Sequence, residues 1–354
     1  MVKESNLNSS RIALYVAGYG NVAKELLKLL PVREKFFLAA IINSRSMAFI
    51  DTEANPDIIE ELLDKGSHAN LEHFISEISK QKFPVKVFID CTANREVASV
   101  YGEMALRGIS VVSCNKIAFS SSFSSWLELR RIFENSGASL HYETTVGAAL
   151  PVVYTIQNLI KGGDKVERVE AILSGTLNYL LSSYNGTESL RSLIIRAKSL
   201  GYTEPDPRLD LSGADVARKA LILSREMGLK TEPEDITYRP LLPDSLYEGS
   251  LEDFYNKLDD YEESFKKLYK ESLSRGERLR YIARISDCSC TTGFESLPAD
   301  HQLALTEGTD NKIIIYSRDY PNSITIAGAG AGSRQTAAGV YNDILKTVDK
   351  FIKT

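Results

Sequence analysis

Short apolar runs recur along the first part of the chain, and most of them are followed by a stretch with helical periodicity. The apolar runs are about as long as buried strands and cover residues 12–17, 36–42, 85–89, 109–112 and 140–142. The helical patterns cover residues 24–30, 97–107 and 126–134. Strands that alternate with helices predict an α/β domain with a doubly wound parallel sheet of the Rossmann type, which we place at residues 1–150.

The pattern of the chain changes after residue 150. Residues 165–173 alternate charged and apolar side chains, which predicts a half-buried strand. Further strands are predicted at residues 279–285, 303–305, 312–317 and 323–326. Together with the charged amphipathic helix at 251–274, these strands predict an α+β domain with an open mixed sheet over residues 151–327. A last helix at 335–346 lets residues 328–354 complete the first domain.

A glycine-containing loop joins the first strand to the first helix. Gly18, Gly20 and Ala23 stand in the order G-x-G-x-x-A, with Asn21 and Val22 between them. The first glycine permits a tight turn, the second lets the backbone approach a pyrophosphate, and the small third residue lets helix and strand pack closely. The phosphates would lie at the helix N-terminus. The loop therefore predicts dinucleotide binding, with a glycine turn in another α/β unit as the alternative.

The turn after the second strand bears on the choice of cofactor. An NAD-selective protein usually has Asp or Glu there, whereas this chain has Asn43-Ser44-Arg45-Ser46. No acid is present to bind a ribose 2′-hydroxyl, and Arg45 could pair with a 2′-phosphate. The turn favours NADP, with NAD as a second cofactor, and an arginine in a solvated loop fits equally well.

Two more predicted strands lead into polar residues. The strand at 85–89 is followed by Thr92, and the strand at 109–112 by Lys116. The carboxyl ends of parallel strands face the ligand crevice, so both residues are candidates for contact with cofactor or substrate. A surface lysine is the alternative for Lys116.

Residues 200–223, LGYTEPDPRLDLSGADVARKALIL, combine acids with an apolar helix. Asp215 and Lys219 are four residues apart, so they share one face of that helix. An exposed ion pair is the common explanation for such a spacing. Here the helix is otherwise apolar, and the preceding loop carries Glu204, Asp206 and Asp210. A partly desolvated lysine steered by a carboxylate can exchange protons, which predicts chemistry on a polar, amine-bearing small molecule.

Three turns are further candidates for binding. Thr176 begins a helix whose N–H groups could hold a carboxylate, although a plain helix cap explains it too. The turn from Glu143 to Leu150 is rich in small residues, so one carboxylate and several carbonyl groups could surround a hard monovalent cation. An ordinary turn is equally compatible. The segment 327–333, AGAGAGS, leaves bare backbone for the nicotinamide side of a cofactor.

Composition and charge exclude several classes of protein. A chain of 354 residues is long enough for about two domains. The net charge of −5 argues against a nucleic-acid surface. No run approaches the ~18 apolar residues of a membrane span, and the polar N-terminus lacks the apolar core of a signal peptide. Four scattered cysteines suit a reducing compartment, so we expect a cytoplasmic protein that acts on a small molecule.

Several strings occur in a fixed order after GYGNVA: SCNK, ETTVGAALPV, SGTLNY, LGYTEPDPRLDLSGADVARKA and GAGAGSRQTAAGV. In this order they resemble homoserine dehydrogenase, over nearly the whole chain from about Arg11 to about Leu345. The resemblance is closest to the monofunctional fungal enzymes and to the C-terminal half of bifunctional aspartokinase–homoserine dehydrogenases. It implies an NAD(P)-dependent interconversion of L-homoserine and L-aspartate 4-semialdehyde, on the route to threonine and methionine. It also implies a catalytic and dimerisation domain after the Rossmann domain, and a homodimer.

The resemblance assigns roles to residues of this chain. The proton-transfer lysine of the family corresponds to Lys219, its acidic partner to Asp215 and the lysine of its N-K signature to Lys116. The substrate residues correspond to Glu204, Asp210, Thr176 and Tyr202. The cofactor contacts of the family correspond to Gly18, Gly20, Asn21, Val22, Arg45, Thr92 and Gly332. Lys116 and Glu204 correspond to further cofactor contacts. The cation cage, which holds sodium in some members, corresponds to Glu143 and the carbonyl groups of Val146, Ala148 and Leu150.

The chain departs from the family pattern at three points. The third loop position is Ala23 rather than glycine, and Ile117 follows Lys116 where many relatives have a second lysine, which thins the positive charge near the phosphates. No kinase domain precedes residue 11 and no regulatory domain follows residue 354, so we do not expect threonine inhibition through such a domain.

The sequence is compatible with two rival functions. One is a semialdehyde dehydrogenase with a cysteine nucleophile, since Cys91 and Cys114 are placed near the crevice, but no histidine is close to either in sequence. The other is a non-catalytic NADP sensor, which would have no reason to keep Glu204, Asp215 and Lys219 together.

Overall fold

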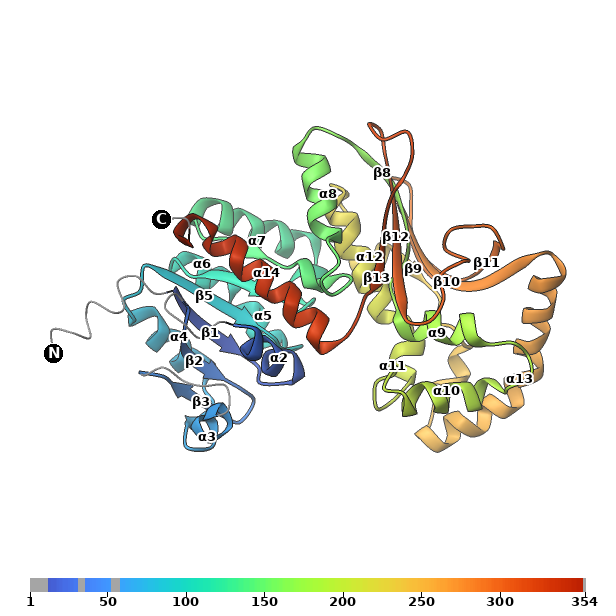
Figure 1. Cartoon of the computed structure of the whole chain (residues 1–354), viewed down its shortest axis with the longest axis horizontal. Helices are drawn as coiled ribbons and strands as arrows, with labels where there is room; N and C mark the ends of the chain where they lie inside the picture. The colour runs from blue at the N-terminus through green and yellow to red at the C-terminus, as the bar shows by residue number, and fades with distance from the viewer. Residues whose placement is uncertain (1–11, 31–35, 52–57, 353–354) are drawn as a thin grey trace. The chain divides into compact units, whose positions relative to one another are not determined.

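The computed structural model describes residues 12–30, 36–51 and 58–352 (Figure 1). It divides into two compact units. Residues 1–149 and 332–354 form the first unit, and residues 150–331 form the second. The chain thus leaves the first unit once and returns to it for its last helix.

The first unit is built on a seven-stranded sheet with the order β4-β3-β2-β1-β5-β6-β7. The strands are β1 (Ile12–Ala17), β2 (Phe36–Ile42), β3 (Ser46–Phe49), β4 (Ser67–His68), β5 (Val85–Asp90), β6 (Ser110–Ser113) and β7 (Leu140–His141). The strands β2, β1, β5, β6 and β7 are parallel to one another. At one edge of the sheet, β3 pairs antiparallel with both β2 and β4. Every residue of β1 is buried, which explains its unbroken apolar sequence.

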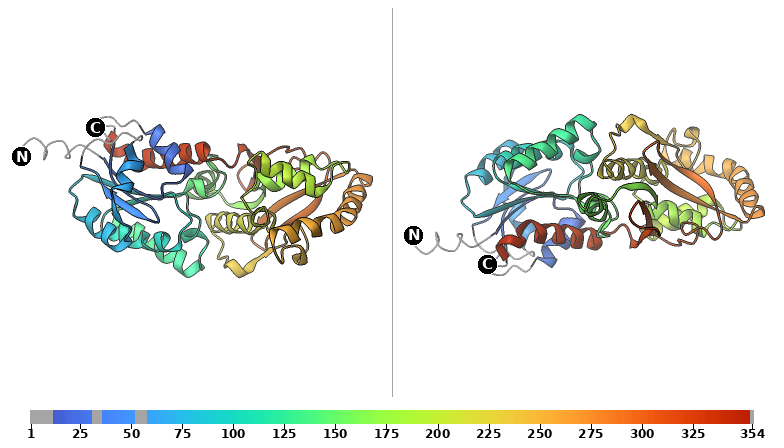
Figure 2. Two further views of the ribbon diagram at one scale, coloured as in Figure 1. Left: turned by 90° about the horizontal axis from the view of Figure 1, so that it is seen from below. Right: turned by 90° about the horizontal axis from the view of Figure 1, so that it is seen from above.

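Helices cover both faces of this sheet (Figure 2). They are α2 (Asn21–Leu29), α3 (Ile59–Asp64), α4 (Leu71–Lys80), α5 (Arg95–Ser99), α6 (Tyr101–Leu106), α7 (Phe123–Ser136) and α14 (Ser333–Ile352). The predicted doubly wound parallel sheet is confirmed. The single helix predicted at 97–107 is wrong in detail, because the backbone leaves the helical conformation at Val100 and separates α5 from α6.

The second unit contains a six-stranded mixed sheet with the order β13-β12-β8-β10-β11-β9. The strands are β8 (Val166–Ile172), β9 (Ile236–Tyr238), β10 (Glu277–Ser286), β11 (Cys290–Pro298), β12 (Asp310–Ser317) and β13 (Ile324–Ala329). Its helices are α8 (Val152–Lys161), α9 (Gly175–Ser183), α10 (Leu190–Ser199), α11 (Arg208–Leu211), α12 (Ala214–Glu226) and α13 (Leu251–Ser274). The strands pair antiparallel except β9 and β11, which are parallel, so the predicted mixed sheet is confirmed.

One predicted strand of the second unit is absent, and two observed strands were not predicted. Residues 303–305 form no strand; Leu303 and Ala304 pack instead against Ile172, Ile282 and Ile314 of the sheet. Tertiary packing, rather than strand pairing, therefore explains why the segment is apolar. The strands β9 and β11 lie in segments without an apolar run, so the sequence pattern did not predict them. They form because β11 pairs with β10 and β9 pairs with β11.

The strand predicted by the alternation at 165–173 is confirmed as β8, in which Glu167 and Arg168 are exposed, but Glu170 is buried where the alternation predicts an exposed side chain. β8 lies between β12 and β10, and Glu170 is only 3% exposed. Its carboxylate pairs with the guanidinium of Arg284 and lies 3.6 Å from that of Arg168. His301 Nε2 is 3.5 Å from the same carboxylate. A buried charge needs such partners, so Glu170 belongs to an ion-pair cluster and not to a solvated face.

Candidate active site

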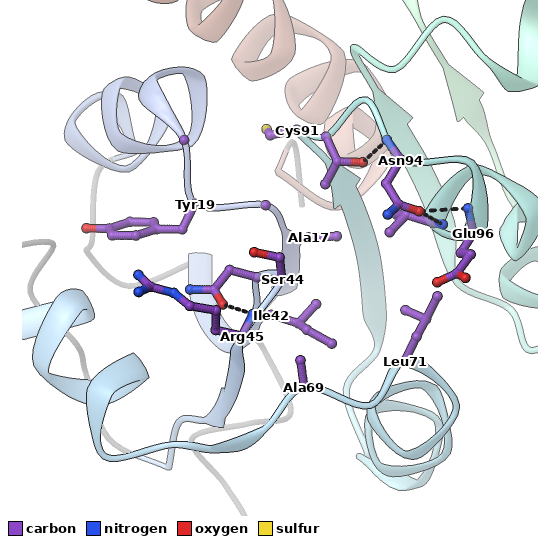
Figure 3. Close-up of a pocket in the computed structure, with 15 residues that line it drawn as sticks. Ala17, Tyr19, Ile42, Ser44, Arg45, Ala69, Leu71, Cys91, Asn94 and Glu96 are labelled. Carbon is purple, nitrogen blue, oxygen red and sulfur yellow. Dashed lines mark hydrogen bonds between the residues drawn. The ribbon is translucent and has the colours of Figure 1, made fainter.

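A pocket of about 580 Å³ opens at the carboxyl ends of β1, β2 and β5 in the first unit (Figure 3). This is the edge of a parallel sheet at which nucleotides bind. The lining residues that follow these strands are Gly18, Tyr19, Gly20, Asn43, Ser44, Arg45, Cys91, Thr92, Asn94 and Glu96. Ala69 and Leu71, at the start of α4, complete the wall.

The glycine loop has the geometry that a phosphate requires. Gly18 has a φ of 90°, and a Cβ atom there would lie only 2.8 Å from Cγ2 of Thr92. Gly20 caps α2 without a side-chain hydrogen bond, and the first turn of α2, where Asn21 and Val22 lie, contains no acid. The positive end of the α2 dipole can therefore accept an anion at the pocket.

The turn after β2 is held by Asn43. Its Oδ1 atom accepts hydrogen bonds from the backbone N–H groups of Arg45 and Ser46, both at 2.8 Å. The Arg45 side chain is exposed and lies on the opposite side of the pocket from Glu96 (Figure 3). Asn43 thus shapes the turn, and Arg45 is the charged group that the turn presents to a ligand.

A buried carboxylate supports the loops that carry Thr92 and Lys116. Asp90, at the end of β5, is fully buried. Its carboxylate accepts hydrogen bonds from the Thr92 N–H at 2.7 Å, the Tyr101 hydroxyl at 2.6 Å and the Asn115 amide at 3.0 Å. Burial raises the pKa of Asp90, although these hydrogen bonds oppose the rise. Sequence reasoning missed Asp90 and Asn115, whose position at the ends of adjacent parallel strands was the available signal.

Five residues predicted to contact the cofactor do not line this pocket. Asn21 and Val22 lie in the first turn of α2. Lys116 is half-buried in the turn after β6. Gly332, with a φ of 121°, precedes α14 at the point where the chain returns to the first unit, and Glu204 belongs to the second unit. The cofactor roles of these five residues stay predictions.

In the second unit, Lys219 lies on the buried side of α12. The side chain of Lys219 is 11% exposed, and its Nζ atom is 2.8 Å from the Asp215 carboxylate. The same ammonium donates a hydrogen bond of 2.8 Å to the carbonyl group of Leu173, at the end of β8. Two acceptors from different elements fix the direction of the ammonium group, which an exposed i,i+4 pair would not require.

The acids of the preceding loop gather beside this lysine. Asp210 accepts the Glu204 N–H at 2.8 Å and the Thr176 hydroxyl at 3.2 Å. Thr176 also donates to the carbonyl group of Tyr202. Burial, together with the negative charges of Glu204 and Asp215, raises the pKa of Asp210. The structure therefore brings Thr176, Tyr202, Glu204, Asp210, Asp215 and Lys219 into one region of the second unit.

Two glycines permit the close packing of this region. Gly213 begins α12 with a φ of 77°, and a Cβ atom there would lie 1.9 Å from the Tyr281 hydroxyl oxygen. A Cβ atom on Gly175, at the start of α9, would lie 2.7 Å from the carbonyl oxygen of Thr309. No side chain fits either position without displacing its neighbour.

The predicted cation turn follows β7. Glu143 is buried, and its N–H group donates to Asp343 of α14 at 3.1 Å. Gly147 and Ala148 have φ values of 78° and 53°. Ala148 is the one non-glycine residue with a positive φ in the part of the chain that the structure describes. A strained backbone of this kind, which redirects successive carbonyl groups, fits a cation held by carbonyl oxygens. Leu150 opens the second unit.

Other kinds of site are absent from the described ranges. Within residues 12–30, 36–51 and 58–352, no three His, Cys, Asp or Glu side chains are grouped as metal ligands. A tightly bound transition metal therefore has no side-chain cage in this part of the chain. No described helix is both long and apolar enough to cross a bilayer.

Comparisons with known proteins agree with this arrangement. The family model described as homoserine dehydrogenase matches residues 151–345, and the model of its NAD binding domain matches residues 18–143. Homoserine dehydrogenase of Saccharomyces cerevisiae is 36% identical over 79% of this chain and 80% of its own length. The bifunctional aspartokinase/homoserine dehydrogenase 1 of Arabidopsis thaliana is 39% identical over 81% of this chain. This chain spans about a third of that relative, 32% of its length.

A solved structure shares the fold of the whole chain. A mutant of a hyperthermophilic archaeal homoserine dehydrogenase in complex with NADPH superposes with a TM-score of 0.75 at 22% identity. The match covers 96% of this chain and 98% of that one. The two family models together match both units, and the chain belongs to the homoserine dehydrogenase family.

Proposed function

We propose that this protein catalyses the NAD(P)-dependent interconversion of L-homoserine and L-aspartate 4-semialdehyde in threonine and methionine biosynthesis. The observation that carries the proposal is the cluster of Lys219, Asp215, Asp210 and Glu204, in the unit that the homoserine dehydrogenase model matches. A binding protein without chemistry would have no need for an ammonium group held between two fixed acceptors.

The acids of the cluster suit the amino group of the substrate. Homoserine carries an ammonium, a carboxylate and a primary hydroxyl group. Glu204 is exposed, and Asp210 lies beside it with an electrostatic interaction between them. Two carboxylates at one place favour a bound cation, because the ammonium relieves their mutual repulsion. They would therefore select an amino acid over a plain alcohol.

Lys219 is the proposed proton-transfer residue. Oxidation of the alcohol removes a hydride from carbon and a proton from oxygen, and the bound nicotinamide supplies the hydride chemistry. Asp215 and the Leu173 carbonyl group hold the Lys219 ammonium in place, 2.8 Å from each acceptor. In oxidation the neutral amine form of Lys219 accepts the proton of the substrate hydroxyl group and becomes the ammonium, and in reduction the ammonium returns that proton to the substrate oxygen. The family resemblance gives Lys116 a supporting catalytic role.

NADP is the proposed cofactor, with NAD as an alternative. The pocket of the first unit offers Arg45, the uncapped N-terminus of α2 and no acid in the turn after β2. An arginine at that turn would pair with a 2′-phosphate, which NAD lacks. The archaeal relative was solved with NADPH.

The remaining proposals follow the family resemblance. A monovalent cation, sodium in particular, would be held by Glu143 and by the carbonyl groups of Val146, Ala148 and Leu150. The left-handed conformation of Ala148 supports this site. A homodimer is proposed from the family resemblance, and a cytoplasmic location because four scattered cysteines suit a reducing compartment.

The test is a direct assay of the purified protein. Reduced NADP is mixed with L-aspartate 4-semialdehyde, and the absorbance of the reduced nicotinamide is followed. We expect the absorbance to fall with formation of homoserine, identified by chromatography, and the reverse reaction to proceed from homoserine and NADP. A protein that binds NADPH but consumes none with this aldehyde would contradict the proposal.

A further inference from the structure

One of the four cysteines, Cys91, lines the cofactor pocket, and Cys114 lies beside it at the end of the next strand. All four are free thiols: Cys288 is exposed, Cys290 is buried, and Cys91 and Cys114 are partly exposed. Cys91 follows Asp90, the last residue of β5, and Cys114 follows Ser113, the last residue of β6. The proposed reaction uses neither thiol.

Strand register places these two cysteines side by side. β5 and β6 are parallel, and Asp90 pairs with Ser113 at their ends. The Cys114 N–H group donates to the Asp90 carbonyl group at 3.1 Å, so the ladder continues one step beyond the strands. Residues at equal steps on adjacent parallel strands are about 4.8 Å apart and project to the same face. That spacing lies within the Cα separation that a disulfide spans.

The two thiols also interact with each other. The Cys114 thiol donates a hydrogen bond of 3.5 Å to the carbonyl oxygen of Asp90. The interaction with the Cys91 thiol lowers the pKa of Cys114, and the charge of Lys116 acts in the same direction while burial opposes it. The interaction with Cys114, together with burial, raises the pKa of Cys91. Cys114 is therefore the better nucleophile of the pair, and Cys91 is placed to resolve a mixed disulfide.

Cys91 belongs to the wall of the cofactor pocket. Its sulfur lies at the end of the pocket remote from Arg45 (Figure 3). Its N–H group donates to Ala17 of β1 at 2.9 Å, and its carbonyl oxygen would lie 3.0 Å from a Cβ atom on Gly18. Because the backbone of Cys91 is packed against the glycine loop, a change at this residue is transmitted to the loop that would hold the phosphates.

We propose that Cys91 and Cys114 form a dithiol modification site that low-molecular-weight disulfides oxidise to an intramolecular disulfide, and that oxidation and cofactor binding oppose each other. The thiolate of Cys114 attacks a small disulfide RSSR, which forms a mixed disulfide and releases RS⁻. The RS⁻ takes the proton of Cys91. Sγ of Cys91 then attacks Sγ of Cys114 and expels the second RS⁻, which takes up the proton that Cys114 had released. Two protein thiols and one RSSR thus give one protein disulfide and two RSH.

Reciprocity gives the proposal a second, independent measurement. If the bound cofactor makes the disulfide less stable at equilibrium, the disulfide must weaken cofactor binding by the same free energy. We expect the oxidised protein to bind NADPH roughly tenfold more weakly than the reduced protein, within the usual range of such couplings.

The experiment uses the full chain and oxidised glutathione. Intact mass and peptide mapping follow the thiols, with and without NADPH, and the fluorescence of bound NADPH gives its dissociation constant. We expect a peptide linked through Cys91 and Cys114, a loss of two hydrogen atoms, and protection by NADPH. The variant Cys114→Ser should form no linked peptide, and oxidised glutathione should leave its NADPH affinity unchanged. Cys288→Ser is the matched control. It should form the linked peptide and lose NADPH affinity on oxidation to the same extent as the chain without a substitution.

Two outcomes would overturn the proposal. One is glutathionylation of Cys288 under conditions in which Cys91 and Cys114 remain unlinked. The other is a linked pair that forms equally fast with NADPH present and leaves the NADPH dissociation constant unchanged. Both readouts are independent of catalysis, so they would stand even if the proposed reaction with aspartate semialdehyde were not observed.

Discussion

At the scale of single residues, the environment of each charged group decides its role. Lys219 and Arg45 are both basic, yet the side chain of Lys219 is 11% exposed with two fixed acceptors, whereas Arg45 stands in the solvent at the rim of a pocket. The first arrangement suits proton exchange, and the second suits recognition of a phosphate. Three predictions belong to this scale.

Removal of the Lys219 amine should stop chemistry and leave cofactor binding intact. We expect Lys219→Ala to lower kcat by roughly 10²–10⁴, the usual contribution of a positioned acid–base group. Lys219→Arg should be nearly as slow, because arginine keeps the charge but does not release its proton. Lys267→Ala, at an exposed position of α13, serves as the control. Near-normal turnover in Lys219→Ala would assign proton transfer to another residue.

Arg45 should discriminate between the two nicotinamide cofactors. In Arg45→Ala, we expect NADP to bind roughly tenfold more weakly while the affinity for NAD changes little, because only NADP has a 2′-phosphate for the guanidinium. Titration of each cofactor by fluorescence measures both constants, with Arg131→Ala on the exposed surface of α7 as the control. Equal losses for NADP and NAD would show that Arg45 does not contact the 2′-phosphate.

Protonation of Asp210 should lower kcat/KM for homoserine at acidic pH and so produce an acidic limb in the pH profile. Its folded pKa is raised by burial and by the charges of Glu204 and Asp215. As the pH falls through this raised pKa, Asp210 becomes neutral and binds the substrate ammonium less well, so kcat/KM falls at a higher pH than an ordinary Asp would cause. We expect Asp210→Asn to lower kcat/KM and to remove this limb. A pH profile unchanged in shape by Asp210→Asn would contradict the assignment.

At the scale of elements, close approaches of backbone to side chains fix where helices begin. Gly213 starts α12 against the Tyr281 hydroxyl, and that start places Asp215 and Lys219 relative to the end of β8. Gly228 follows the same helix with a φ of 87° and has open space where a Cβ atom would stand. The two glycines share a backbone conformation and differ in packing, which makes them a matched pair.

Alanine at the two positions should separate backbone strain from steric conflict. We expect Gly228→Ala to reduce the free energy of unfolding by about 1–2 kcal/mol, the cost of a left-handed alanine. Gly213→Ala should cost about 1–3 kcal/mol more because of overpacking, and should also lower kcat. Urea unfolding measures the free energy of unfolding, and the assay with reduced NADP and L-aspartate 4-semialdehyde measures kcat. Equal destabilisation by both variants would mean that Tyr281 moves aside without cost.

At the scale of the whole molecule, the chain is divided between two units with separate sheets. The pocket at the ends of β1, β2 and β5 lies wholly in the first unit, and the lysine–acid cluster lies wholly in the second. The chain crosses between them at residues 149–150 and 331–332. Cofactor binding should therefore stabilise the first unit directly, which gives a prediction for the intact protein.

NADPH at one hundred times its dissociation constant should raise the free energy of unfolding of the first unit by about 2.7 kcal/mol. Scanning calorimetry of the full chain, with and without NADPH, measures the accompanying rise in midpoint. In Gly18→Ala the rise should disappear, because the added Cβ atom would lie 2.8 Å from Thr92 and distort the glycine loop. A full stabilisation of Gly18→Ala by NADPH would contradict the proposed role of that loop.

The sequence by itself determined whatever depends on neighbours along the chain. The apolar runs predicted the parallel strands, the order G-x-G-x-x-A predicted the loop over α2, and the spacing of Asp215 and Lys219 put them on one helical face. Each of these signals is local, because periodicity and turn chemistry act over a few residues.

Only the tertiary structure decided the partners that are distant in sequence. The Leu173 carbonyl group on Lys219, the Thr176 hydroxyl on Asp210 and the burial of Glu170 all depend on how strands and helices pack. The strands β9 and β11 and the Cys91–Cys114 pair likewise exist through strand register. Their physical cause is long-range pairing and desolvation, and no pattern of neighbouring residues encodes it.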